Sequence, residues 1–135
     1  MKKHTCRTYF LITGKFDPKE LCHTLGIIPT RTVRCGEPRG MRGIPATQDE
    51  VEIGFNDRYR VDINEMIRKT LAELAEKTAL LADLRKKHDL TYALVIVPEI
   101  DTHSDEPHPI LSLDEDIVEF LYRTGARHDL DYYIL

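Results

Sequence analysis

Acidic side chains between residues 99 and 119 are the group in this chain with the clearest potential for chemistry. The stretch holds no Lys or Arg and eight carboxylates, Glu99, Asp101, Asp105, Glu106, Asp114, Glu115, Asp116 and Glu119. A block of like charge is most often a solvated surface, and anions are also favoured in a first helical turn such as 114–116. The functional alternative is a docking face for a basic partner, since complementary fields speed encounter and fix orientation. We take these eight residues as candidate partner-binding residues.

The same stretch combines five potential metal ligands within eight positions, Asp101, His103, Asp105, Glu106 and His108. Carboxylates and imidazoles do bind divalent ions. Their spacing, however, matches neither an EF-hand loop nor an HExxH helix. We predict a polar loop that holds no metal or other cofactor, and a metal at this loop remains the open alternative.

A second candidate site is the loop at residues 31–43, where glycines alternate with four arginines, Arg31, Arg34, Arg39 and Arg42. Glycines let backbone amides approach an anion, and guanidinium groups bind phosphate with two hydrogen bonds. The loop lacks the GxxxxGK[ST] pattern of a P-loop. It is either a solvated, internally paired loop or a site for a small anion or nucleotide.

Charge is segregated along the chain. Residues 1–48 hold nine Lys or Arg and three Asp or Glu, a net charge of +6, whereas residues 49–135 hold ten and twenty, a net charge of −10. The overall net charge is −4, which argues against a nucleic-acid protein with a broad basic face. The segregation favours a protein that binds an oppositely charged partner.

No set of residues supports catalysis. Ser104, Ser112 and His88 can be combined with aspartates on paper, but sequence spacing does not show which side chains meet. His23 lies in a predicted helix and is expected to be a packed or surface histidine. The sequence therefore favours a non-enzymatic protein and leaves an enzyme as the open alternative.

Length, composition and cysteine use indicate one cytoplasmic domain that spans residues 1–135. Apolar residues make up 41% of the chain and charged residues 31%, which is typical of a globular protein. The longest apolar run, 93–97, is far too short to cross a bilayer, and the first residues do not resemble a secretion signal. Three cysteines at wide spacing are expected to be free thiols, Cys6, Cys22 and Cys35.

Hydrophobic periodicity and capping signals predict alternating strands and helices. Strands are expected at 5–13, 32–35, 50–55, 91–97 and 130–134, with Pro98 closing the fourth. Helices are expected at 17–25, 62–88 and 112–124, each opened by a capping box that begins at Asp17, Asp62 and Ser112. Gly26 and Gly125 are expected to stop the first and the last helix. The long helix is favoured because no Gly or Pro interrupts it.

This order of elements predicts an α+β fold, with helices packed on a mixed, largely antiparallel sheet. The first six elements read βαββαβ, a ferredoxin-like order, and an αβ unit follows them. Edge strands of such a sheet can pair, so a homodimer is an open alternative.

Motifs at both ends of the chain carry a family resemblance. The N-terminal motifs are Tyr9-Phe10-Leu11-Ile12-Thr13-Gly14, Asp17-Pro18, Leu25-Gly26-Ile27, Pro29-Thr30 and Gly36-Glu37. The C-terminal motifs are Ile110-Leu111-Ser112-Leu113, Thr124-Gly125-Ala126 and Leu130-Asp131-Tyr132-Tyr133. Together they resemble a bacterial family catalogued as domain of unknown function 4279. The resemblance implies a compact α+β domain with no assigned activity, and some relatives look like members of toxin and immunity gene clusters.

The charge layout and this resemblance lead to one functional prediction and one alternative. We predict a non-enzymatic binding protein, most concretely an immunity-type protein that neutralises a basic toxin domain through the acidic stretch. The alternative is a domain that binds a small anion or nucleotide, or an enzyme, using the loop at 31–43. Neither prediction involves a membrane or a nucleic acid.

Overall fold

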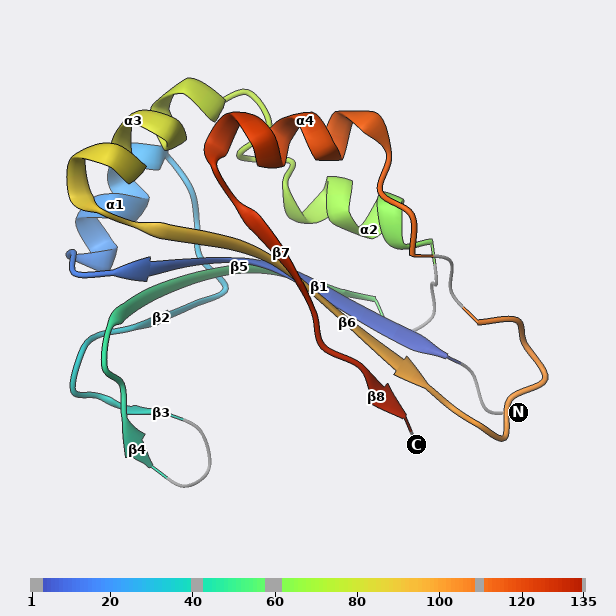
Figure 1. The fold of residues 1–135 in the computed structure, drawn as a ribbon. Helices are drawn as coiled ribbons and strands as arrows, with labels where there is room; N and C mark the ends of the chain where they lie inside the picture. Colours follow the sequence, from blue (N-terminus) through green and yellow to red (C-terminus); the bar gives the residue numbers. More distant parts are fainter. Residues whose placement is uncertain (1–3, 40–42, 58–61, 109–110, 135) are drawn as a thin grey trace.

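A mixed sheet with helices on one face forms the body of the protein. The computed structural model describes residues 4–39, 43–57, 62–108 and 111–134. Its strands are β1 (Thr5–Gly14), β2 (Arg31–Val33), β3 (Pro38–Arg39), β4 (Ile44–Pro45), β5 (Asp49–Asp57), β6 (Thr91–Ile100), β7 (Arg127–Leu130) and β8 (Tyr133–Ile134). Its helices are α1 (Pro18–Leu25), α2 (Ile63–Thr70), α3 (Thr78–His88) and α4 (Glu115–Thr124). The predicted α+β class is confirmed (Figure 1).

The main sheet has the strand order β2-β5-β1-β6-β7, and β8 also pairs with β6. β1 runs antiparallel to both β5 and β6, and β5 runs antiparallel to β2. β7 and β8 run parallel to β6, while β3 and β4 form a separate hairpin. A mixed, largely antiparallel sheet is therefore confirmed. The simple βαββαβ order is not confirmed, because the β3–β4 hairpin and a second helix interrupt it.

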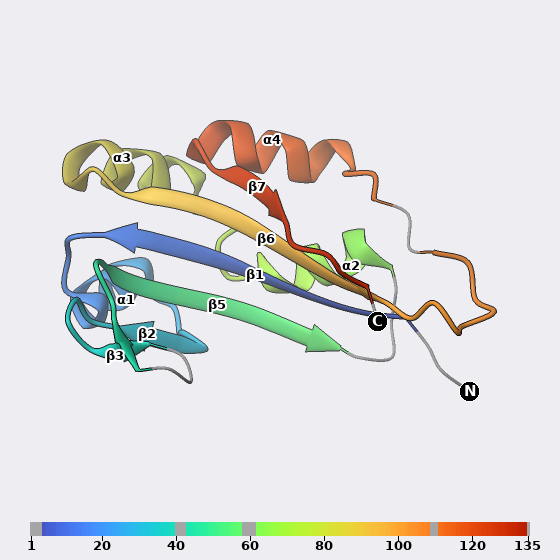
Figure 2. The ribbon, with the colours of Figure 1, turned by 60° about the horizontal axis from the view of Figure 1, so that its bottom comes forward.

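Helices α1 to α4 all lie on one face of the sheet (Figure 2). Alternate residues of β1 point to that face and are buried, including Phe10 and Ile12. The Phe10 ring lies 5.6 Å from the ring of Tyr92 on β6 and 5.8 Å from that of Phe120 on α4, measured between centroids. These aromatic contacts fix α4 on the centre of the sheet. On the opposite face a smaller cluster consists of Ala93, Val95 and Val97 with Tyr9 and Leu11.

The start of the first helix and the glycine stops of the first and last helices are as predicted. The Asp17 carboxylate accepts a hydrogen bond from the Lys19 N–H at 3.0 Å, and Pro18 occupies the start of α1. Gly26 and Gly125 follow α1 and α4 with φ of 66° and 75°. A left-handed backbone is easiest for glycine, so these residues stop the helices.

The single helix predicted for residues 62–88 is wrong. α2 ends at Thr70, turns occupy 71–76, and α3 begins at Thr78. Leu71 leaves helical geometry with φ −90° and ψ 1°, and Leu74 N–H donates to the Leu71 carbonyl in a tight turn. Leu71, Leu74 and Leu81 are all buried in this arrangement. Burial of these leucines against the curved sheet thus overrides the uninterrupted helix-forming sequence.

Three element boundaries also differ from the predictions. The cap of α4 is Asp114 and not Ser112, because the Asn64 side chain binds both the Ser112 carbonyl and the Asp114 N–H. β6 runs two residues beyond Pro98. The Ile96 carbonyl accepts a hydrogen bond from the Asp131 N–H, so Ile96 directs its backbone groups to the β7 side of the strand. Pro98, two residues later, faces the same side, in the gap between the pairing with β7 and the pairing with β8. The missing N–H of Pro98 therefore breaks no hydrogen bond of the sheet. The single strand predicted at 130–134 is replaced by two short strands, β7 and β8.

Candidate functional site

Arg68 on α2 joins two carboxylates of the acidic stretch. Its Nη2 lies 2.5 Å from an Asp114 carboxylate oxygen, and its Nε lies 2.9 Å from one of Asp116. The hydrogen bond from Arg68 is the main cause that lowers the pKa of Asp116. Asp114 is the N-cap of α4, but its side chain accepts no hydrogen bond from the backbone of the first helical turn, because the carboxylate binds Arg68 instead. The Arg68 guanidinium, which is far from these residues in sequence, therefore forms ion pairs with two of the eight acidic residues.

Helix α4 presents the remaining charge because its opposite side is anchored in the core. Ile117, Phe120 and Leu121 are buried, whereas Glu115 and Glu119 on the outer side are exposed. Glu119 pairs with Arg123 one turn later at 2.7 Å. An exposed pair at this spacing contributes little to stability, so Glu119 remains available to a stronger partner.

The loop that carries the other acidic residues is fixed by His4. The His4 side chain is 1% exposed. Its Nδ1 accepts a hydrogen bond from the Asp101 N–H at 3.1 Å, so its Nε2 carries the proton that is donated to the Glu106 carbonyl at 2.9 Å. The ring also packs edge-on against His108. Residues 101–108 are thereby tied to the N-terminal strand.

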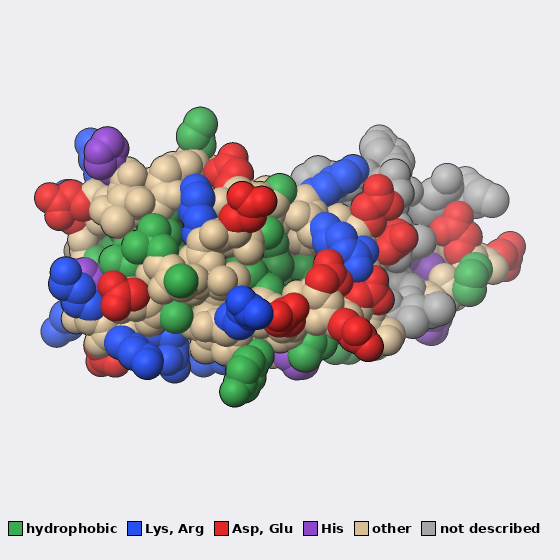
Figure 3. Space-filling model, turned by 90° about the horizontal axis from the view of Figure 1, so that it is seen from above, with side chains coloured by type: hydrophobic (Ala, Val, Ile, Leu, Met, Phe, Trp, Pro, Cys, Tyr) green, Lys and Arg blue, Asp and Glu red, His purple; other side chains and the backbone are tan. Residues whose placement is uncertain are grey.

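We call the eight carboxylates from Glu99 to Glu119 the acidic end. Arg68 and Arg123 are the cations that ion-pair with it among the described residues, apart from the ring of His103 beside Asp101. Eight negative charges against two arginines leave a net charge of −6 with histidines neutral. Viewed over the helices, Asp and Glu side chains gather toward the end where α4 begins (Figure 3). Counted over the residues that the structure describes, the acidic end is therefore largely uncompensated.

A groove of about 490 Å³ lies beside the acidic end, between α4 and the segment that joins α2 to α3. Leu71, Ala75, Ile117 and Phe120 supply its apolar lining. Charged side chains complete the lining, namely Arg68, Asp116, Glu119 and Arg123. This combination suits a protein segment that offers an apolar side chain next to positive charge. The sequence could not indicate the groove, because it exists only through the unpredicted break between α2 and α3.

The arginine loop at 31–43 meets carboxylates of its own surroundings. Arg31 lies 3.5 Å from Glu52 and 3.9 Å from Glu50, and Arg34 lies 3.9 Å from Asp17. Arg39 belongs to β3, and Arg42 lies outside the described residues. Arg31 and Arg34 therefore contact internal acids, which fits the internally paired alternative better than an anion site.

Asp49 on β5 organises the same region through backbone hydrogen bonds. Its two carboxylate oxygens accept from the N–H groups of Cys35 at 2.8 Å and Phe16 at 2.9 Å. The bond from Cys35 is the first cause that lowers the pKa of Asp49, followed by the bond from Phe16. This carboxylate therefore fastens two loops to β5.

The remaining candidates form no reactive group in the described parts of the chain. No cluster of three His, Cys, Asp or Glu side chains there could hold a metal. The three cysteines are free as predicted, with Cys6 and Cys22 buried and Cys35 exposed. Burial raises the pKa of the Cys6 thiol to about 11. His23, His88 and Ser112 are exposed on separate elements, and the Ser104 hydroxyl accepts from the Glu106 N–H within its own loop.

Comparisons with known proteins identify a family but no characterised relative. The model of a family described as domain of unknown function (DUF4279) matches residues 4–135. No curated protein and no solved structure matches the chain. None of the helices described is long and apolar enough to cross a membrane.

Proposed function

Because this chain belongs to the DUF4279 family, whose function is unknown, we propose a function from its own surface. The protein is a non-enzymatic cytoplasmic binding protein that docks a basic protein partner on its acidic end. The observation that carries this proposal is the net charge of −6 that remains at the acidic end when the ion pairs of Arg68 and Arg123, taken from the described residues, are counted. An uncompensated field of this kind steers an oppositely charged partner and orients it.

The groove beside α4 supports a protein as the partner rather than a free cation. Protein interfaces combine an apolar centre with a polar rim, and residues in the centre contribute most of the binding energy. Phe120 and Leu71 line such a centre, while Asp116 and Glu119 stand at its rim. A basic segment with one apolar side chain would fill the groove and meet the carboxylates around it.

The most concrete partner is a basic toxin domain, which makes this chain an immunity-type protein. Two arguments support that choice, the acid excess and the resemblance of some family members to components of toxin and immunity gene clusters. A protein that blocks a basic catalytic or nucleic-acid-binding face needs many carboxylates on a firm scaffold. His4 and Arg68 supply that firmness here, because they hold the acidic loop and the start of α4 in place.

Co-expression with each neighbouring gene, followed by affinity capture and size-exclusion chromatography, tests the proposal. We expect one stoichiometric complex whose dissociation constant rises with salt. Glu115→Lys combined with Glu119→Lys should weaken it at least about tenfold, since each 1.4 kcal/mol is a factor of ten. Asp83→Lys on α3 is the matched control and should leave the affinity nearly unchanged. Absence of any stoichiometric partner would overturn the proposal.

A further inference from the structure

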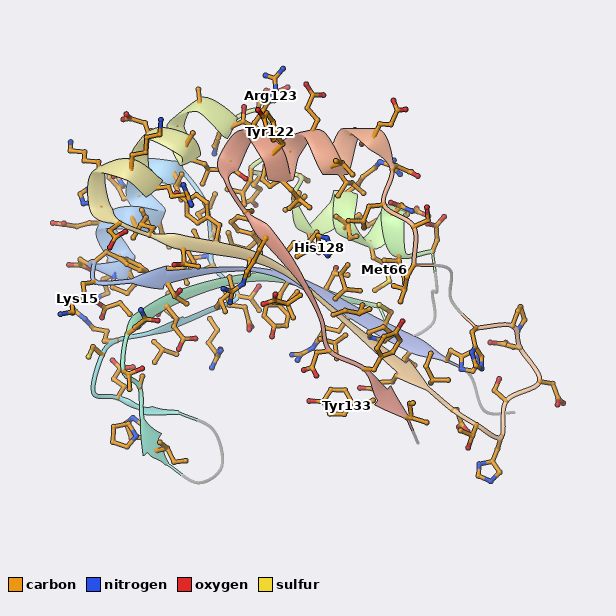
Figure 4. All side chains as sticks on the ribbon, viewed as in Figure 1. Lys15, Met66, Tyr122, Arg123, His128 and Tyr133 are labelled. Carbon is orange, nitrogen blue, oxygen red and sulfur yellow. The ribbon has the colours of Figure 1, made fainter. Side chains whose placement is uncertain are left out.

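Exposed apolar side chains are concentrated at one edge of the molecule. Six of the eight large hydrophobic residues that the described structure exposes lie between residues 118 and 134, namely Val118, Tyr122, Leu130, Tyr132, Tyr133 and Ile134. They come from α4, from β7 and β8, and from the link at 131–132 between these strands, which follow one another along this edge (Figure 4). Single exposed apolar residues are normal, but a group of this size marks a surface that another molecule covers.

The backbone of the same edge is open to pairing. β7 is the outermost strand of the sheet beside β6. The Asp131 N–H donates to the Ile96 carbonyl and therefore points inward. Successive residues of a strand direct their backbone groups to opposite sides, so His128 and Leu130 turn theirs outward. An unpaired edge of this kind is a template for another strand.

Charge shows which strand fits this edge. Arg127 and Asp129 stand on one face of β7, where the Arg127 Nε donates to an Asp129 carboxylate oxygen at 3.2 Å. This pair is exposed, with 65% and 45% of the two side chains open to solvent, so both charges can also meet facing residues of another strand. If a second β7 runs antiparallel with His128 opposite His128, Arg127 of each copy lies opposite Asp129 of the other. Opposite charges at facing positions stabilise such a pair, whereas sliding one strand by two residues would place Asp129 opposite Asp129. The edge is thus complementary to itself.

We propose that two copies of this chain associate by antiparallel pairing of β7 around His128. The pairing has the two-fold symmetry of most homodimers, because the same patch serves on both copies. It extends each sheet across the axis and gives the outward backbone groups of His128 hydrogen-bond partners. Leu130 and Tyr122 of both copies lie beside the axis and lose their exposure to water. The inference is independent of the partner proposed for the acidic end.

A charge-swap experiment on the full-length protein tests both the dimer and its register. The unchanged protein should have twice the monomer mass of 15.6 kDa by light scattering after size exclusion. Arg127→Asp and Asp129→Arg, each alone, place like charges opposite each other and should give monomers. A mixture of the two variants should form a heterodimer, because every facing pair is then complementary again. The double variant Arg127→Asp/Asp129→Arg should also dimerise.

Controls separate pairing from folding. Lys86→Asp removes a cation on α3 and should leave the dimer intact, and circular dichroism should show all variants folded. A monomeric unchanged protein at about 100 μM, well above the usual range of stable dimers, would overturn the proposal. A dimer that survives both single substitutions, or single variants that stay monomeric when mixed, would overturn this edge and register.

Discussion

The acidic end and the arginine loop have opposite charge, and they also differ in how that charge is balanced. Arg31 and Arg34 find carboxylates on β5 and before α1, close to their own loop. Within the described parts of the chain, Arg68 and Arg123 are the arginines that pair with the eight carboxylates of the acidic end. From the sequence, both regions are clusters of like charge that could bind a partner. The ion pairs of the folded chain balance the arginines Arg31 and Arg34, whereas most carboxylates of the acidic end have no arginine beside them in the described structure. Binding is therefore expected at the acidic end and not at the loop.

The largest expected difference between the two regions concerns their anchoring. Phe120 holds α4 on the core and is buried, whereas Ile44 in the hairpin of the arginine loop is 61% exposed. Phe120→Ala should lower the free energy of unfolding by about 3–5 kcal/mol, since it leaves a cavity in the core. Ile44→Ala should change it by less than about 0.5 kcal/mol. Urea denaturation measures both, and equal losses would contradict the anchoring of α4.

A smaller effect is expected where His4 fastens the acidic loop. His4→Phe keeps the ring but leaves the Asp101 N–H and the Glu106 carbonyl without this partner. The free energy of unfolding should fall by roughly 1–3 kcal/mol, the usual cost of an unsatisfied buried group. His103→Phe in the same loop is the control, because that side chain is 75% exposed. If both variants unfold at the same urea concentration, His4 does not hold the loop.

The two regions should also differ in how their low carboxyl pKa values respond to a substitution. Arg68 lowers the pKa of Asp116, while backbone N–H groups lower that of Asp49. Arg68→Met should therefore raise the pKa of Asp116 toward the usual range of an aspartate and leave that of Asp49 unchanged. A lowered native pKa means that each carboxylate stabilises the fold above its unfolded pKa, and this stability is lost as pH falls through the native value. Carboxyl NMR titration follows both groups, and a matching shift of Asp49 would contradict the assignment of causes.

The smallest change concerns thiol reactivity, which differs between the regions without affecting stability. Cys35 in the arginine loop is exposed, whereas Cys6 on β1 is buried with a pKa of about 11. Iodoacetamide at pH 7.5 should label Cys35 and leave Cys6 and Cys22 unmodified, because the thiolate is the reactive form. Mass spectrometry of the peptides shows the sites. Rapid labelling of Cys6 in the folded protein would show that β1 is less protected than its burial indicates.

Local signals predicted much of the fold. The Asp17 cap, the glycine stops and the alternation of β1 depend on neighbours in sequence, and the structure bears them out. The break after Thr70 could not be predicted, because the burial of Leu71 and Leu74 against the sheet produces it. The site shows the same limit. Arg68 lies 46 residues from Asp114 and His4 lies 102 from Glu106, so their contacts arise only from the tertiary structure.

Reversing one charge in each region and measuring affinity for the captured partner tests the central claim most directly. Glu115→Lys reverses an exposed carboxylate of the acidic end, and Arg34→Glu reverses an exposed cation of the arginine loop. Isothermal titration calorimetry should show a weaker complex for Glu115→Lys, by about fivefold to tenfold, and less than about a twofold change for Arg34→Glu. Weakening by Arg34→Glu alone would place the partner at the loop and contradict the account.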